Sequence, residues 1–467
     1  MQRKEELKKA GLLYLIGNLF NKGIAFLTVP IFTRILSTYD YGVVNTYNSW
    51  VAILNMVLGC ALTMGVRASF IDYEKEADGF IASILKFTFS VTIGASLFAG
   101  LITYFLPINR IYVVLVILCC LHGGFWAIID DYLQYLMMKY RYRERTILMI
   151  LPNLIALSGS IAVIMLLLNS EKYLGRIVTT SIVYILFGIY VLFLNSKKSV
   201  PREKRKEYVK YGLSVSTPLI LHGIALNLLS QSDRTMITWL ADASQTGIYS
   251  LIYNFSMIAT VITTSLDGLW VPHFIDSLKK REIEDINEKA TWYIALMTCS
   301  MVCLVLVGPE TVKILAPSSY WEGISIIPPI VLANYLIFCY SLYVNTEHFY
   351  KKTKSIAAYT VAAAIFNLVA NYIFIPKYGY VAAAYTTLAS YIVALVLHAR
   401  KAIMLEPNVL PLKNFASSFI VVCVGTVLFY VFQEIWIVRW SIAIGFFTYS
   451  IVRHKELLIS LFSRKNM

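Results

Sequence analysis

Ionisable side chains stand at a few positions of this sequence where the surrounding residues are apolar. Lys22 lies within NLFNKGIAFLTVPIF and Arg34 ends the same stretch, while Asp233 and Arg234 follow the polar residues SQS inside a later apolar stretch. An ionisable group within a membrane is costly, and it usually faces a protein interior or a water-filled cavity. Because Arg offers planar paired donors and Lys a point charge, these positions predict a cavity for phosphate or pyrophosphate.

Other charged positions extend this set. Arg67 closes an apolar stretch and is a further candidate for substrate binding, although a plain loop role is equally open. Asp267, Glu347 and Asp233 are the candidates for ion coupling, because a desolvated carboxyl group can take up a proton. A partner Lys or Arg would instead make Asp267 structural. No His or Cys spacing predicts a metal site, and no cofactor is expected beyond a coupling proton.

Further ionisable groups lie near the ends of apolar stretches. Lys86 is one or two turns inside its stretch, from where a long side chain can reach the membrane surface. Asp130 and Asp131 are adjacent acids near the end of another stretch. Cations outnumber acids among the deepest positions, which favours an anionic substrate.

The elements that must position these residues are membrane-spanning helices. The chain has 467 residues, of which 58% are hydrophobic and 15% charged, whereas soluble domains average about 45–50% and 25%. A spanning helix needs about 20 apolar residues. We therefore predict an all-α integral membrane protein with about 14 transmembrane helices. The predicted spans are 10–34, 42–66, 79–106, 111–138, 146–169, 174–195, 209–232, 245–273, 290–308, 324–348, 355–375, 380–399, 414–432 and 436–452.

The basic residues are distributed unevenly between the predicted loops. With fourteen spans, the two ends of the sequence and every second loop fall on one side, and these segments contain 31 of the 41 Lys and Arg residues. By the positive-inside rule we expect both termini in the cytoplasm. The net charge of +14 then reflects topology and attraction to anionic lipids, and no nucleic-acid partner is expected.

The two halves of the sequence resemble each other at an offset of about 200 residues. TRILSTYDYGVVNTYN, which begins at Thr33, parallels DRTMITWLADASQTGIYSLIYN, which begins at Asp233, and Gly175 parallels Gly379. A chance likeness between apolar helices is the alternative. We predict an N-terminal lobe of six helices (1–196), a basic cytoplasmic linker (197–208), a C-terminal lobe of six helices (209–403), and two accessory helices with a cytoplasmic tail (404–467). Transporters with parallel repeats bind substrate near the midplane and alternate access by rocking one half against the other.

Several of these segments carry a family resemblance over nearly the whole chain. They are GNLFNKGIAFLTVPIFTRILSTYDYG, QSDRTMITWLADASQTGIYSLIYNF, LAPSSYWEGISIIPPI and FNLVANYIFIPKYGYVAAAYTTLASY. In this order they resemble the Wzx-type polysaccharide or O-antigen flippases of the multidrug/oligosaccharidyl-lipid/polysaccharide (MOP) exporter superfamily.

The resemblance implies a substrate, a mechanism and a location. The substrate would be an undecaprenyl-pyrophosphate-linked oligosaccharide, moved from the cytoplasmic to the outer leaflet of the bacterial inner membrane by alternating access that is coupled to a proton or sodium gradient. The resemblance also implies two lobes around a cationic cavity, and its pattern covers Arg34, Asp233 and Arg234. Lys22 and Asp267 are inferred from their depth alone. Expected partners are membrane lipids and, in the same pathway, a polysaccharide polymerase and glycosyltransferases.

Other functions remain open at this stage. A flippase for the lipid-linked peptidoglycan precursor would bind similar chemistry, whereas a drug exporter of the same superfamily should have an acid-rich cavity. A membrane polymerase or ligase would need a large external loop, but the longest predicted one spans only residues 308–323. The loops contain no Gly-rich nucleotide motif and no nucleophile elbow. We therefore expect a transporter and not an enzyme.

Overall fold

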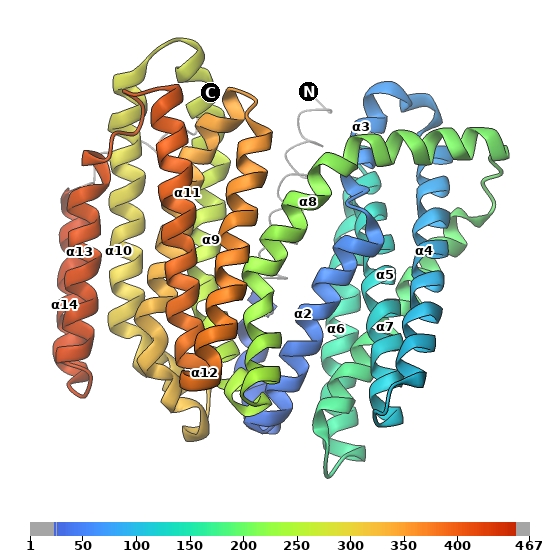
Figure 1. The fold of residues 1–467 in the computed structure, drawn as a ribbon, viewed down its shortest axis with the longest axis horizontal. Coiled ribbons are helices and arrows are strands. Elements are labelled where there is room, and N and C mark those ends of the chain that lie inside the picture. The colour runs from blue at the N-terminus through green and yellow to red at the C-terminus, as the bar shows by residue number, and fades with distance from the viewer. Residues whose placement is uncertain (1–22, 25, 454–467) are drawn as a thin grey trace. The chain divides into compact units, whose positions relative to one another are not determined.

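The computed structural model describes residues 23–453, except residue 25, and leaves the side chains of residues 218–222 undescribed. Within this range all regular elements are helices, and ten of them are long and apolar enough to cross a membrane. The chain forms two compact units, Met1–Thr238 and Trp239–Met467, which are coloured from blue to green and from yellow-green to red in Figure 1. The prediction of an all-α multi-span membrane protein is confirmed.

The first unit begins with a short apolar helix, Phe26–Ile35. It continues through α2 (Thr38–Gly59), α3 (Thr63–Asp72), the 3-10 turn η1 (Glu74–Glu76), α4 (Ala77–Phe105), α5 (Arg110–Met138), α6 (Tyr142–Leu167), α7 (Lys172–Ser196) and α8 (Arg202–Leu240). Its core lies around α4 and α5, where Phe80, Ile84 and Ile128 have no exposed surface. Side chains without exposed surface must be covered by several neighbouring helices, because one helix can cover only one face of another.

The second predicted span, 42–66, is divided in the structure. Helix α2 ends at Gly59 and α3 begins at Thr63, because Cys60 and Ala61 both adopt the left-handed conformation with φ near 49°. Few side chains other than Gly or Asn favour this conformation, so neither residue type indicated a break at this position. A divided helix leaves backbone groups that can line a polar cavity within a membrane protein.

The second unit contains α9 (Ala243–Lys279), α10 (Ile283–Leu315), η2 (Ser318–Ile326), α11 (Ile327–Phe349), α12 (Thr353–Leu405), α13 (Lys413–Val431) and α14 (Trp436–Arg453). The long α12 is a hairpin that reverses at Gly379, where φ is 57° and ψ is −144°. Asn367 donates to Thr387 at 3.5 Å, and Thr386 donates to Asn371 across the two arms. These arms are the predicted spans 355–375 and 380–399.

One helix contact recurs in both units. In the first unit, the third residue of α2, Asp40, accepts a hydrogen bond of 3.2 Å from the backbone N–H of Tyr173. In the second unit, the third residue of α9, Gln245, accepts one of 3.1 Å from the backbone N–H of Tyr380. Both contacts join the segments that the sequence comparison had aligned. The division of the repeats at residues 197–208 stays a prediction.

The basic loops meet at one end of each unit, which we call the basic end. In the first unit, Asp78 pairs with Lys139 at 3.2 Å and with Lys198 at 3.3 Å, so three loops converge. In the second unit, Arg281 pairs with Glu406 at 2.9 Å. Every second loop of the sequence therefore lies at the same end of its unit, as expected for helices that cross the membrane one after another.

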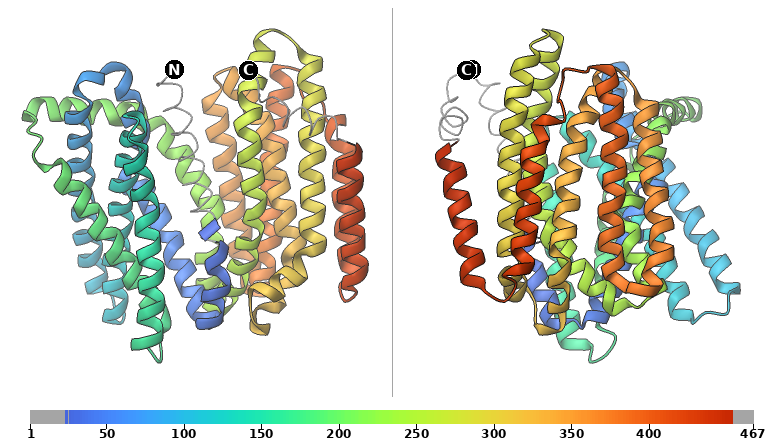
Figure 2. Two further views of the ribbon diagram at one scale, coloured as in Figure 1. Left: turned by 180° about the vertical axis from the view of Figure 1, so that it is seen from behind. Right: turned by 60° about the vertical axis from the view of Figure 1, so that its left-hand side comes forward.

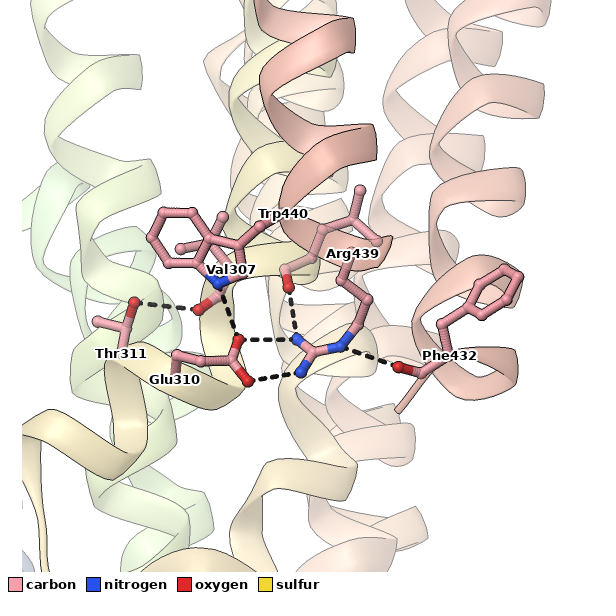
Figure 3. A network of polar contacts seen from close by, with 7 residues as sticks. Val307, Glu310, Thr311, Phe432, Arg439 and Trp440 are labelled. Atoms are coloured by element: carbon pink, nitrogen blue, oxygen red, sulfur yellow. Dashed lines mark hydrogen bonds and ion pairs between the residues drawn. The ribbon is translucent and has the colours of Figure 1, made fainter. Parts of the chain in front are cut away.

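The accessory helices α13 and α14 both pack against α10, and they form the red edge of the second unit in Figure 2. Arg439 of α14 is 1% exposed and pairs with Glu310 of α10 through two bonds of 2.6 and 3.0 Å (Figure 3). Its other N–H groups donate to the carbonyl oxygens of Leu306 and Phe432 at 2.6 and 3.0 Å. Trp440 Nε1 also donates to Glu310, at 3.1 Å. This network holds α14 to the core of the unit.

Candidate functional site

A polar seam joins α2 and α8 in the first unit and contains Arg234. Gln231, Arg234 and Thr238 are three and four residues apart, so they share one face of α8. Arg234 Nη1 donates to Gln231 Oε1 at 2.9 Å, and Ser49 of α2 donates to the same oxygen at 3.2 Å. Thr46 of α2 and Thr238 lie 2.7 Å apart. The guanidinium is thus held between two helices in a polar environment.

Both charged residues of this seam are deeply buried. Asp233 is 1% exposed and Arg234 is 5% exposed. A lipid-facing Arg would extend toward the membrane surface, whereas this one is covered by protein. The structure therefore places the predicted pair inside the first unit.

A second polar region of the first unit is a cavity beside the break between α2 and α3. It has a volume of about 470 Å³ and is lined by Asn55, Asp130, Asp131 and Asn227, together with residues of the break. Asn55 Nδ2 donates to Asp130 Oδ2 at 3.0 Å. Asp131 is 1% exposed, and its Oδ2 has no hydrogen-bond partner among the described residues. We call this region the acidic cavity.

The acidic cavity has the chemistry of a small-cation site. It offers two carboxylates and two carboxamides, all of them oxygen donors. In transporters, coupling ions bind where oxygen groups gather beside an interrupted helix. Adjacent acids at 130 and 131 were visible in the sequence, but only the fold brings them to Asn55 and the helix break. No cluster of three metal-binding side chains occurs in the described part of the chain.

The second unit contains a buried acid paired with a histidine. Glu347 of α11 is 0% exposed and His398 of α12 is 1% exposed. His398 Nδ1 lies 2.5 Å from Glu347 Oε1, and Ser355 donates to the other carboxylate oxygen at 2.8 Å. The His398 ring stacks on Tyr340 at a centroid distance of 5.5 Å. His398 was missed in the sequence, because a single His near a helix end gives no signal by itself.

The remaining predicted residues lie at more exposed positions. Arg34 ends the helix Phe26–Ile35 and donates to the carbonyl oxygen of Pro30 at 2.8 Å. Arg67 is exposed on α3, and Asp267 is half-buried on α9. Lys22 lies outside the described residues.

The comparisons with known proteins agree on family and fold. A family model described as "Polysaccharide biosynthesis protein" matches residues 7–277. A protein of the Lsg locus of Haemophilus influenzae is 21% identical over 370 residues, which cover 76% of this chain and 88% of that protein. A second membrane protein of the same organism is also 21% identical over 370 residues, covering 78% of this chain and 89% of that one.

Two solved structures share the architecture. The lipid II flippase MurJ, in an inward closed conformation, superposes with a TM-score of 0.66 over 96% of this chain and all of that one, at 13% identity. An inward-facing multidrug resistance transporter of the MATE family, from the MOP superfamily, reaches 0.58 over 85% of this chain and 99% of that one, also at 13% identity. At this identity the likeness concerns the fold. Since the family model matches more than half of the chain, this chain belongs to the polysaccharide biosynthesis protein family, and its fold is the one seen in the MurJ and MATE structures.

Proposed function

We propose that this protein is a flippase for undecaprenyl-pyrophosphate-linked oligosaccharide, the repeat unit of an O-antigen or a capsule. The observation that carries the proposal is the match to the polysaccharide biosynthesis family on a fold shared with a lipid II flippase. Lipid II flippase activity belongs to the solved relative, and the family description favours a polysaccharide precursor here.

The proposed location is the bacterial inner membrane, with both termini in the cytoplasm. The basic end of each unit then faces the cytoplasm, in agreement with the positive-inside rule. A substrate made in the cytoplasm would be accepted on that side and released to the outer leaflet.

We propose that cationic side chains bind the pyrophosphate of the substrate. Arg234 is the first candidate, because it is buried and its fork of donors matches a phosphate group. Arg34, Arg67 and Lys22 complete the proposed set, and Asp233 would orient Arg234 or take part in coupling.

We propose that transport is driven by a proton or sodium gradient. The acidic cavity and the pair of Glu347 with His398 are the favoured coupling sites, since buried acids and histidines in membrane helices commonly relay protons. Asp267 is a further candidate, and it is less enclosed than Glu347.

Two functions of related proteins compete with this proposal. A peptidoglycan precursor flippase is favoured by the likeness to MurJ, and a drug exporter by the likeness to the MATE transporter. The buried Arg234 supports an anionic substrate over a cationic drug. A polysaccharide polymerase and glycosyltransferases are the proposed pathway partners.

The function can be tested in a bacterium that lacks its own O-antigen flippase. Expression of this chain together with the matching glycosyltransferases should restore surface polysaccharide, measured by blotting of whole cells. Arg234→Ala should abolish restoration at equal membrane levels, whereas Arg110→Ala, which removes the same charge from an exposed position at the start of α5, should not. Normal surface polysaccharide with Arg234→Ala would contradict the role of that residue.

A further inference from the structure

A pocket at the basic end of the first unit is lined by four cationic side chains. Lys86 comes from α4, and Arg205, Lys206 and Lys210 come from the beginning of α8. The pocket has a volume of about 470 Å³, within the range of about 300–1,000 Å³ common for ligand sites. We call it the basic pocket.

The first turns of α8 present two different faces. Residues 205, 206, 209, 210 and 213 line the basic pocket. On the other face, Lys204 donates to Glu76 at 2.7 Å, and Tyr208 and Tyr211 donate to Glu76 and Asp72. Figure 1 shows this part of α8 crossing the ends of α3 and α4 before the helix bends.

Three acids at this end of the unit, Asp72, Glu76 and Asp78, have partners outside the basic pocket. Glu76 and Asp72 face Lys204 and the tyrosines, and Asp78 pairs with Lys139 and Lys198. Four cations close together repel one another unless an anion lies among them.

The cations of the basic pocket form no direct ion pair with a carboxylate of the described residues. Among the described residues, no salt bridge involves Lys86, Arg205, Lys206 or Lys210, and Arg205 Nε has no hydrogen-bond partner. An anion supplied from outside the chain would satisfy these donors.

The rest of the pocket lining is apolar. Phe87 of α4 and Val209 and Leu213 of α8 lie beside the cations. A soluble phosphate would make no favourable contact with these apolar side chains. A molecule with an anionic head and a hydrocarbon tail would contact both parts of the pocket, because apolar surface is stabilised by contact with acyl chains.

We propose that the basic pocket binds the phosphodiester headgroup of an anionic membrane phospholipid. The four cations hold the phosphate, while Phe87, Val209 and Leu213 contact the upper part of the acyl chains. The bound lipid fixes the beginning of α8 against α4 at the membrane surface. On the proposed orientation this lipid belongs to the cytoplasmic leaflet, and the site itself does not depend on which molecule the protein transports.

The binding test uses the full chain purified in neutral detergent, with native mass spectrometry to titrate added lipid. Phosphatidylglycerol is the anionic probe, phosphatidylcholine the zwitterionic one, and inorganic pyrophosphate the soluble one. Each Lys near an anionic headgroup contributes about fivefold in affinity. Lys206→Gln with Lys210→Gln should therefore weaken phosphatidylglycerol binding about 25-fold.

A matched control removes the same charge from the same helix. Arg202→Gln with Lys204→Gln changes positions outside the basic pocket, where the hydrogen bond to Glu76 raises the pKa of Lys204. This control should weaken phosphatidylglycerol binding less than about threefold. Lys206→Arg with Lys210→Arg should retain binding and shows that the altered positions tolerate substitution.

Four results would overturn the proposal. The first is that both Gln pairs weaken lipid binding equally, and the second is that the wild type binds phosphatidylcholine as tightly as phosphatidylglycerol. The third is that equimolar pyrophosphate displaces the lipid. The fourth is that Lys206→Gln with Lys210→Gln leaves lipid binding unchanged. The second would indicate a site without charge selectivity, and the third a site for soluble phosphate.

Discussion

The attachment of α14 to α10 should depend on the charge of Glu310. In the folded protein Arg439 is 1% exposed, and both of its bonds to a carboxylate go to Glu310. Glu310→Gln keeps the shape and an acceptor for Trp440 but leaves a buried guanidinium with only carbonyl oxygens as partners. Removing one member of a buried ion pair costs about 3–5 kcal/mol.

This cost can be expressed as a melting shift. A unit of more than 200 residues loses roughly 2 °C of Tm per kcal/mol, so Glu310→Gln should lower the Tm by about 6–10 °C. The assay is thermal aggregation of the detergent-extracted, fluorescently tagged chain, followed by size-exclusion chromatography. Combining Glu310→Gln with Arg439→Met should recover most of the loss, since replacing a whole buried pair by apolar contacts is often neutral.

An exposed pair supplies the control. Lys280 and Asp276 lie 2.7 Å apart with more than half of each side chain exposed, and Asp276→Asn should cost at most about 1 kcal/mol. A Tm shift with Glu310→Gln no larger than that with Asp276→Asn would show that the buried pair does not hold α14 to α10. A double variant no more stable than the single one would show that the unpaired guanidinium is not the cause of the loss.

Three further predictions concern the hairpin and the proposed coupling sites. Gly379→Ala should destabilise the second unit by about 1–3 kcal/mol, measured as a lower Tm, because φ is positive and the new Cβ would lie 2.0 Å from Gln245 Oε1; an unchanged Tm would contradict this. Asp131→Asn should lower polysaccharide export about 5- to 150-fold, the usual range of a coupling between sites, at equal protein level, and unaltered export would exclude the acidic cavity from coupling. Glu347→Gln keeps an acceptor for His398 but removes the buried carboxylate charge, so polysaccharide export should fall at equal protein level; unaltered export would argue against a role of this pair.

Most of the helices could be predicted from hydropathy. Long apolar stretches between charged loops predict spans because lipid requires every backbone group to bond within its own helix. The hairpin of α12 was predicted as the two apolar spans 355–375 and 380–399. The break at Cys60 and Ala61 was missed, since neither residue type favours a positive φ and the apolar pattern continues across it.

The candidate site was predicted only in part. Arg234 could be singled out because a charge after three polar residues has no lipid-facing explanation. Its contacts with Gln231 and Ser49 depend on how α2 packs against α8, which no local pattern encodes. The pairing of Glu347 with His398 likewise joins residues 51 positions apart in the sequence.

Loop charges could mislead as well as inform. Arg176 stands near the start of the predicted span 174–195, yet it donates to Ser160 at 3.2 Å and lies 4.3 Å from the ring of Phe32. Arg439 stands near the start of the predicted span 436–452 and is buried against Glu310. Sequence spacing gives the topology, whereas partners from other helices decide whether a cation is a loop charge or a packing element.

The central claim is that the chain moves a lipid-linked oligosaccharide across a membrane. The most direct measurement reconstitutes the full chain into vesicles that contain fluorescent undecaprenyl-pyrophosphate-linked oligosaccharide in the inner leaflet, and follows its exposure to an external lectin. The account predicts that exposure requires the protein, accelerates with an imposed proton or sodium gradient, and is lost with Arg234→Ala but kept with Arg110→Ala. Exposure at the rate of protein-free vesicles, under either gradient, would contradict it.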